Sequence, residues 1–180
     1  WVPTQFQEAC MDVAKEISEL DEEQIKIYTT YIGGGFGRRG ETDFVKQSLI
    51  LSKELGKPVK VTWMREEDIQ QGFYRPASMS RFQIGLNKDG FPVSWNNQLA
   101  SPSILKRFFA PMAWFNVDPL STEGADEIPY AIEDFNLDYT EVDSGVPVGF
   151  WHSVGSSFNA FFIESAIDES AHLAGQDPLL

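Results

Sequence analysis

The glycine run between residues 31 and 40 places the strongest constraint on how this chain can fold. Four glycines and one aromatic residue occupy positions 33–37, and a further glycine stands at position 40. Glycine lacks a Cβ, so its backbone adopts positive φ without steric penalty and can approach a ligand closely. The run follows an alternating, strand-like stretch and precedes a helix-like repeat. The sequence therefore predicts a tight strand-to-helix turn that is a candidate cofactor-binding loop.

Within this run, Gly35, Gly37 and Gly40 form a GxGxxG pattern. Between a strand and a helix, this pattern is typical of dinucleotide-binding domains, in which the helix N-terminus faces a phosphate. Such a domain also needs a parallel sheet and an acidic residue about 20 residues further on. Glu66 is the nearest acid to that position. The alternative is that the glycines only build a tight turn.

The composition limits the kinds of molecule that this chain is expected to bind. The 180 residues include 14 Lys and Arg against 27 Asp and Glu, which gives a formal net charge of -13. Most of this surface would repel a phosphate backbone, so nucleic acid is not an expected partner. Cys10 is the only cysteine, which excludes an internal disulfide and a cysteine-based metal cluster built from this chain alone. No apolar run approaches the roughly 20 residues that a membrane-spanning helix needs.

Hydrophobic periodicity predicts both helices and strands. Helices are predicted over residues 5–20, 42–55 and 159–174, and strands over 24–32, 59–64, 81–86, 91–99 and 132–142. Asp89-Gly90 predicts a hairpin between the third and fourth of these strands. The sequence predicts a polar turn or helix at residues 65–68. It predicts an irregular but packed segment with one helical turn over residues 101–125.

This order of elements favours an α+β fold with mixed sheets and packed helices over a doubly wound sheet. The chain length suits one domain or two small lobes. We expect two subdomains, residues 1–84 and 85–180, that meet near residues 85–101.

Four motifs follow one another along almost the whole chain. They are Pro3-Thr4-Gln5, Gly33-Gly34-Gly35-Phe36-Gly37-Arg38-Arg39, Arg65-Glu66-Glu67-Asp68 with Tyr74-Arg75-Pro76, and Val148-Gly149-Phe150-Trp151-His152-Ser153-Val154-Gly155. In this order they resemble the molybdopterin-binding large subunit of the xanthine dehydrogenase and aldehyde oxidase family, of the isoquinoline 1-oxidoreductase beta-subunit type. The resemblance implies that residues 1–180 are a fragment of the molybdenum-cofactor-binding domain.

The resemblance also implies roles for particular residues. The pterin dithiolene would hold the molybdenum, so the protein would supply few or no metal ligands. Gln5 would hydrogen-bond an oxo ligand, and His152 stands where the family commonly has an arginine that orients the substrate. Val154 would line the substrate pocket at a position that is often aromatic. The cofactor-binding residues would be Gly34, Gly35, Phe36, Gly37, Arg38 and Arg39.

Plainer interpretations of the same residues stay open. Gln5 could be an exposed residue of a first helical turn. Arg38 and Arg39 could be solvated charges, and His152 could be a packed histidine. Gly40 stands where purine-oxidising relatives carry a glutamate, which disfavours purines as substrates. The family's general base is a glutamate far toward the C-terminus, and no residue here matches its motif.

The function implied is hydroxylation of aldehydes or N-heteroaromatic compounds, with water as the oxygen source and electrons leaving through iron-sulfur centres. The expected partners are an iron-sulfur subunit or domain, the remainder of the large subunit and a small-molecule substrate. We expect the fragment alone to be inactive, and to self-associate through surface that the remainder would cover. An NAD- or FAD-binding oxidoreductase domain and a non-catalytic scaffold are the alternatives. Both cytoplasm and periplasm remain open as locations.

Overall fold

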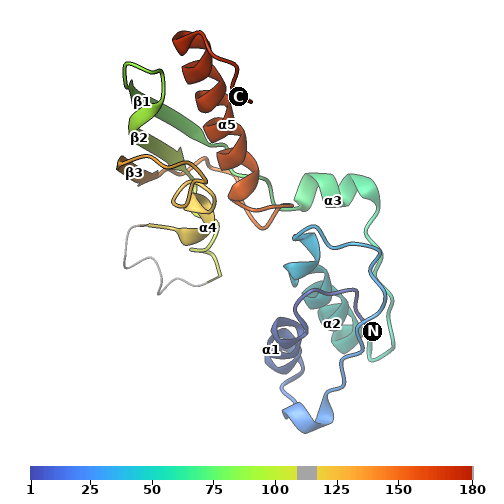
Figure 1. Ribbon diagram of the computed structural model, residues 1–180. Helices are drawn as coiled ribbons and strands as arrows, with labels where there is room; N and C mark the ends of the chain where they lie inside the picture. The colour runs from blue at the N-terminus through green and yellow to red at the C-terminus, as the bar shows by residue number, and fades with distance from the viewer. Residues whose placement is uncertain (109–116, 180) are drawn as a thin grey trace. The chain divides into compact units, whose positions relative to one another are not determined.

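The computed structural model describes residues 1–108 and 117–179, and the chain forms two compact units, Trp1–Phe73 and Tyr74–Leu180. Figure 1 shows the elements of both units, coloured from the N-terminus to the C-terminus. The boundary falls before strand β1 (Met79–Leu86), not between residues 84 and 85. A division at residue 84 would cut a strand that pairs with β2 (Pro92–Ser101).

Unit 1 consists of helices and extended segments. Its elements are α1 (Gln7–Ser18), α2 (Asp43–Leu55) and α3 (Arg65–Gln71), with the 3₁₀ turns η1 (Glu22–Gln24) and η2 (Arg38–Gly40). α1 and α2 pack together around Val2, Cys10 and Val45, of which Cys10 is fully buried. The two predicted helices here are confirmed, and the charged residues 65–68 open a third.

The strands predicted over residues 24–32 and 59–64 do not form ladders. In the first stretch, Thr29 makes only an isolated parallel bridge with Val2. The second stretch joins no strand among the described residues. The alternating pattern identified segments with one buried face, but a strand also needs a neighbour with free backbone groups.

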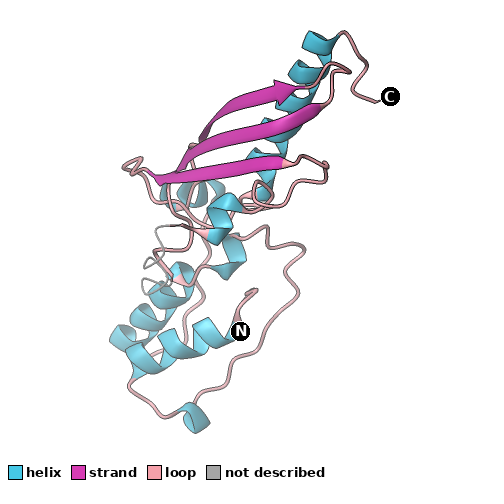
Figure 2. Cartoon of the chain, turned by 60° about the vertical axis from the view of Figure 1, so that its left-hand side comes forward, coloured by secondary structure: helices cyan, strands magenta, loops and turns pink. Residues whose placement is uncertain are grey.

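Unit 2 contains a three-stranded mixed sheet in the order β1-β2-β3. β1 and β2 form the predicted antiparallel hairpin, and β3 (Asp134–Glu141) runs parallel to β2. α5 (Ser156–Ala174) packs on one face, where Trp95, Ile163 and Ala166 form the core (Figure 2). The short α4 (Pro119–Thr122) supplies the predicted helical turn, although the middle of that excursion lies outside the described residues. The α+β prediction is confirmed.

Because of Tyr139 on β3, unit 2 is expected to lose stability at alkaline pH. Burial raises the pKa of Tyr139 to about 12 from its ordinary value of 10.0, and its hydroxyl donates to the Ser101 carbonyl oxygen at 3.1 Å. The folded state therefore holds this proton more tightly than the unfolded state, so its contribution is complete below pH 10 and is lost as the pH rises toward 12. We expect Tyr139→Phe to flatten the fall of the urea midpoint across this range. An unchanged slope would contradict the assignment.

Candidate functional site

The glycine run is a loop with an unusual backbone. Gly33, Gly34 and Gly37 have φ values of 64°, 119° and 84°, and Phe36 has φ 52°. Such values strain any residue except glycine, so Phe36 is held in place by its surroundings. Its side chain is 64% exposed. The loop thus presents backbone and one aromatic ring to the surroundings.

The dinucleotide-binding interpretation is wrong for this loop. It leads into the short η2 turn rather than directly into a helix, and α2 begins only at Asp43, whose carboxylate already lies at the helix start. The described part of unit 1 has no parallel sheet. Glu66 lies in the first turn of α3 and not at the end of a strand.

Gln5 is bound to the glycine loop through both its backbone and its side chain. Its backbone N–H donates to the Arg39 carbonyl oxygen at 2.8 Å, and its Oε1 accepts from the Gly37 N–H at 3.1 Å. Because a backbone N–H can only donate, this bond fixes which way the side-chain amide points. The Nε2 group makes no hydrogen bond with a described residue, and the residue is exposed. Gln5 therefore presents two free donors beside the loop.

The start of α1 differs from the predicted helix start at residue 5. Thr4 Oγ1 accepts from the Phe6 N–H at 2.9 Å and donates to the Arg39 carbonyl oxygen at 3.2 Å. The hydroxyl thus joins the chain start to the end of the glycine loop, and α1 begins at Gln7. Gln5 is consequently a loop-bound residue and not part of a helical turn.

Gly35 leaves the space that the Gln5 side chain occupies. A Cβ at position 35 would lie 2.2 Å from Oε1 and 2.3 Å from Cδ of Gln5, which is far inside van der Waals contact. No positive φ is involved at this position. Gly33, by contrast, has open space around its Cα, and its amide, like that of Gly34, makes no hydrogen bond with a described residue.

The two arginines of the loop have different surroundings. Arg38 donates to both carboxylate oxygens of Asp43 and to Asp68 Oδ1, each at 2.9 Å. Arg39 makes no ion pair with a described residue, and its guanidinium lies 5.4 Å from the centre of the Phe44 ring. Of the two side chains, Arg39 is the one available to an anion. Arg38 could meet a cofactor only through its backbone.

In unit 2, two of the sequence motifs dock on each other. The Tyr74 N–H donates to the Pro147 carbonyl oxygen at 2.9 Å, and the Gly149 N–H donates to the Tyr74 carbonyl oxygen at 3.1 Å. Arg75 then donates to the His152 carbonyl oxygen at 3.3 Å and to Ser157 Oγ. Its guanidinium also lies 5.6 Å from the Trp151 ring centre. Burial lowers the pKa of Arg75.

The segment that Arg75 holds is strained. Ser153 and Val154 have φ values of 65° and 46°, and a β-branched residue seldom adopts such a conformation. The Val154 N–H donates to the Trp151 carbonyl oxygen at 2.7 Å. Behind it, a Cβ at Gly155 would lie 2.2 Å from the Leu120 carbonyl oxygen. His152 is exposed at this turn, so it is not a packed core histidine.

Arg75 belongs to one of the sequence motifs, but its bonds to this turn were not predicted, and its loss should loosen the turn. We expect Arg75→Met, which keeps the aliphatic stem but removes the donors, to speed amide exchange over residues 153–157 at least ten-fold. Arg81→Met is the matched control, because Arg81 lies exposed on β1 without an ion pair to a described residue. Equal exchange rates in the two variants would show that Arg75 does not hold the turn.

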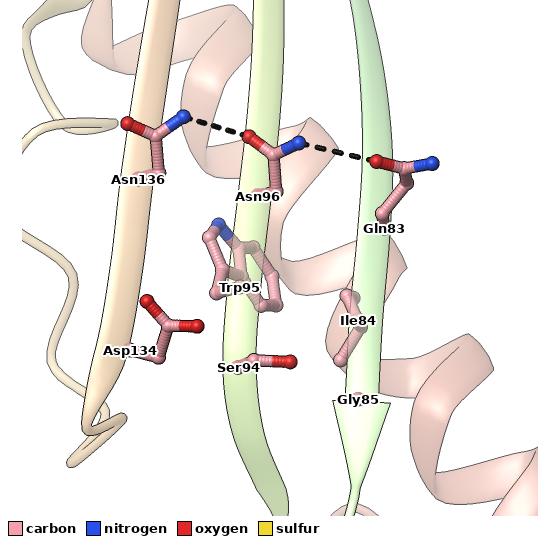
Figure 3. Close-up of a pocket in the computed structure, with 8 residues that line it drawn as sticks. All are labelled: Gln83, Ile84, Gly85, Ser94, Trp95, Asn96, Asp134 and Asn136. Carbon is pink, nitrogen blue, oxygen red and sulfur yellow. Dashed lines mark hydrogen bonds between the residues drawn. The ribbon is translucent and has the colours of Figure 1, made fainter.

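A hollow of about 480 Å³ lies on the sheet face of unit 2 (Figure 3). Across its three strands, Asn136 Nδ2 donates to Asn96 Oδ1 at 2.8 Å, and Asn96 Nδ2 donates to Gln83 Oε1 at 3.2 Å. These amides largely satisfy one another, and none is a residue that the sequence singled out. Within residues 1–108 and 117–179, no group of three His, Cys, Asp or Glu side chains could hold a metal ion. No helix in the same ranges is long and apolar enough to cross a bilayer.

Comparison with known proteins identifies a family and several relatives that this chain resembles. The family model of the molybdopterin cofactor-binding domain matches residues 1–180. The beta chain of isoquinoline 1-oxidoreductase from Brevundimonas diminuta is 28% identical over 99% of this chain and 23% of its own length. A nicotinate dehydrogenase subunit of Pseudomonas putida is 28% identical over 88% of this chain and 14% of its own length. The aldehyde oxidoreductase molybdenum-binding subunit of Escherichia coli is 25% identical over 99% of this chain and 23% of its own length.

The chain thus spans less than a quarter of the length of these relatives. Since the family model covers every residue, including the glycine loop and the turn that Arg75 holds, this protein belongs to the molybdopterin cofactor-binding domain family.

Proposed function

We propose that this chain forms the cofactor-holding part of a molybdenum hydroxylase that oxidises aldehydes or N-heteroaromatic compounds. The observation that supports this most directly is the bond between Gln5 Oε1 and the Gly37 N–H, which aims the Nε2 donors outward beside an exposed glycine loop. A molybdopterin-type cofactor carries oxo and phosphate oxygens that accept such donors. When bound, it would supply the redox chemistry that transfers an oxygen atom from water to the substrate.

The glycine loop fits an anionic cofactor in three respects. The amides of Gly33 and Gly34 make no hydrogen bond with a described residue, and the space beside Gly33 is open. The Arg39 guanidinium has no carboxylate partner among the described residues. A planar guanidinium matches phosphate geometry better than an ammonium does. We assign Gly34, Gly35, Phe36, Gly37 and the Arg38 backbone to the same surface.

In unit 2 we propose that His152 and Val154 contact the substrate. The strained turn gives both residues a defined position, and Arg75 holds that position from behind. The imidazole of His152 would orient a polar substrate atom through a hydrogen bond. We further propose that an iron-sulfur subunit or domain accepts the electrons and that the rest of the large subunit supplies the general base.

The test uses the full-length protein, purified with its iron-sulfur partner from a host that makes the cofactor. We expect near-stoichiometric molybdenum and pterin, and incorporation of ¹⁸O from labelled water into oxidised aldehyde. Gln5→Met should lower the molybdenum content and, per bound molybdenum, lower kcat about two- to thirteen-fold, because one hydrogen bond to the cofactor contributes about 0.5–1.5 kcal/mol. A wild-type protein that purifies without molybdenum would favour the scaffold alternative.

A further inference from the structure

Two stretches of unit 1 have the side-chain alternation of β-strands without being part of a sheet. In residues 25–28 and 59–64, partly buried side chains alternate with exposed ones. The partly buried residues are Ile25, Ile27, Val59, Val61 and Trp63. Figure 1 draws both stretches as loops. Each therefore has one face turned toward the interior of unit 1 and no ladder beside it.

Many backbone N–H groups of these stretches also lack a hydrogen-bond partner among the described residues. The N–H groups of Lys26 and Tyr28, and those of residues 59–63, make no hydrogen bond with a described residue. The two stretches make none with each other. Unpaired backbone groups at a strand edge readily accept an added strand.

A cavity of about 920 Å³ lies within unit 1 and is lined by both stretches. Trp1, Val2 and Pro3 also line it, as do the apolar residues Cys10, Ala14, Val45 and Leu49 of α1 and α2. Its lining thus combines two open backbone edges with an apolar surface, and it also includes the charged residues Lys26, Arg38, Arg39, Lys60, Arg65 and Asp68. An extended segment with small apolar side chains on its inner face matches both properties.

Val2 defines the direction and the register of such a segment. Its N–H donates to the Tyr28 carbonyl oxygen at 2.9 Å, and its carbonyl oxygen accepts from the Thr30 N–H at 3.2 Å. This is one rung of a parallel ladder. Along a strand, every second residue directs its N–H and carbonyl oxygen to the same neighbour. The rung before the one at Thr29 would therefore use the Lys26 carbonyl oxygen and the Tyr28 N–H.

We propose that an extended segment of the same protein, outside residues 1–180, fills this cavity as a β-strand. It runs parallel to residues 25–28 in the register set by Val2, which already forms the rung at Thr29, and its other edge pairs with residues 59–63. The relatives are more than four times as long as this chain, so most of their length lies outside the matched part. A second copy of the chain is the less suitable occupant, because Val2 already begins the ladder from within. The inference does not depend on the proposed chemistry.

Residue-resolved hydrogen exchange of the full-length protein and of chain 1–180 tests this proposal. In the full-length protein we expect the Lys26 and Tyr28 amides, and those of residues 59–63, to exchange at least 100-fold more slowly than in chain 1–180. The amides of α1 and α2 serve as the control for folding, since both samples should protect them.

Three results would overturn the proposal. Fast exchange of these amides in the full-length protein would mean that no strand pairs with them. Slow exchange in chain 1–180 at low concentration would mean that the two stretches close on each other. Protection that grows with the concentration of chain 1–180 would identify a second copy as the occupant.

Discussion

Gly35→Ala is expected to remove most of the molybdenum and pterin from the full-length protein. The added Cβ would lie 2.2 Å from Gln5 Oε1, so the Gln5 side chain must leave and the Gly37 N–H loses its acceptor. Losing that bond together with one cofactor contact costs about 1–3 kcal/mol, which is about five- to 150-fold in affinity. Metal analysis and pterin fluorescence of the purified variant measure the loss.

Gly56→Ala is the matched control for this substitution. Gly56 ends α2 with φ 61° and has nothing within 4 Å of its missing Cβ, so alanine there adds backbone strain of about 1–2 kcal/mol but no clash. It should keep its cofactor. In a Gln5→Ala background, Gly35→Ala should have little further effect, because the clashing atoms are gone. A Gly35→Ala protein that loads normally would contradict the role of this contact.

Local signals predicted the elements that local interactions form. Asp89-Gly90 predicted the hairpin, where Gly90 has φ 85°, and Gly175 ends α5 with φ 69°. The pairing of β3 with β2 was not predictable, because a parallel neighbour is chosen by tertiary packing and leaves no local turn signal. For the same reason, the strand patterns at residues 24–32 and 59–64 did not reveal whether a partner strand was present.

The candidate site was predictable as a list of residues but not as a set of contacts. The glycine run suggested close approach of a ligand at Gly35, whereas the side chain of Gln5, far away in sequence, occupies that space. Arg38 was interpreted with Arg39 as a phosphate-binding or solvated pair. Its partners Asp43 and Asp68 come from two different helices, and only the folded chain brings them to one guanidinium.

Arg38 is the centre of the polar network in unit 1. Its guanidinium binds both oxygens of Asp43 and one of Asp68, and its Cζ lies 5.1 Å from the centre of the Trp63 ring and 5.5 Å from that of Phe44. Burial acts to lower the pKa of Arg38, but the hydrogen bonds and charges of the two aspartates outweigh it, so the pKa is raised. The side chain is only 20% exposed. The network therefore joins the glycine loop to α2 and α3.

Arg38→Met should consequently destabilise the chain by about 2–3 kcal/mol, below the 3–5 kcal/mol typical of a fully buried pair, since both carboxylates retain some solvent. Asp43 would lose its arginine partner, and Asp68 would keep only the exposed Arg65, 3.8 Å away. Urea unfolding measures the cost. Arg39→Met, which loses only a ring contact, should cost less than about 1 kcal/mol. Adding Asp43→Asn and Asp68→Asn to Arg38→Met should recover part of the loss, because the unpaired charges are then removed. Equal effects of the two arginine substitutions would show that Arg38 is a surface charge and not the link between the loop and the helices.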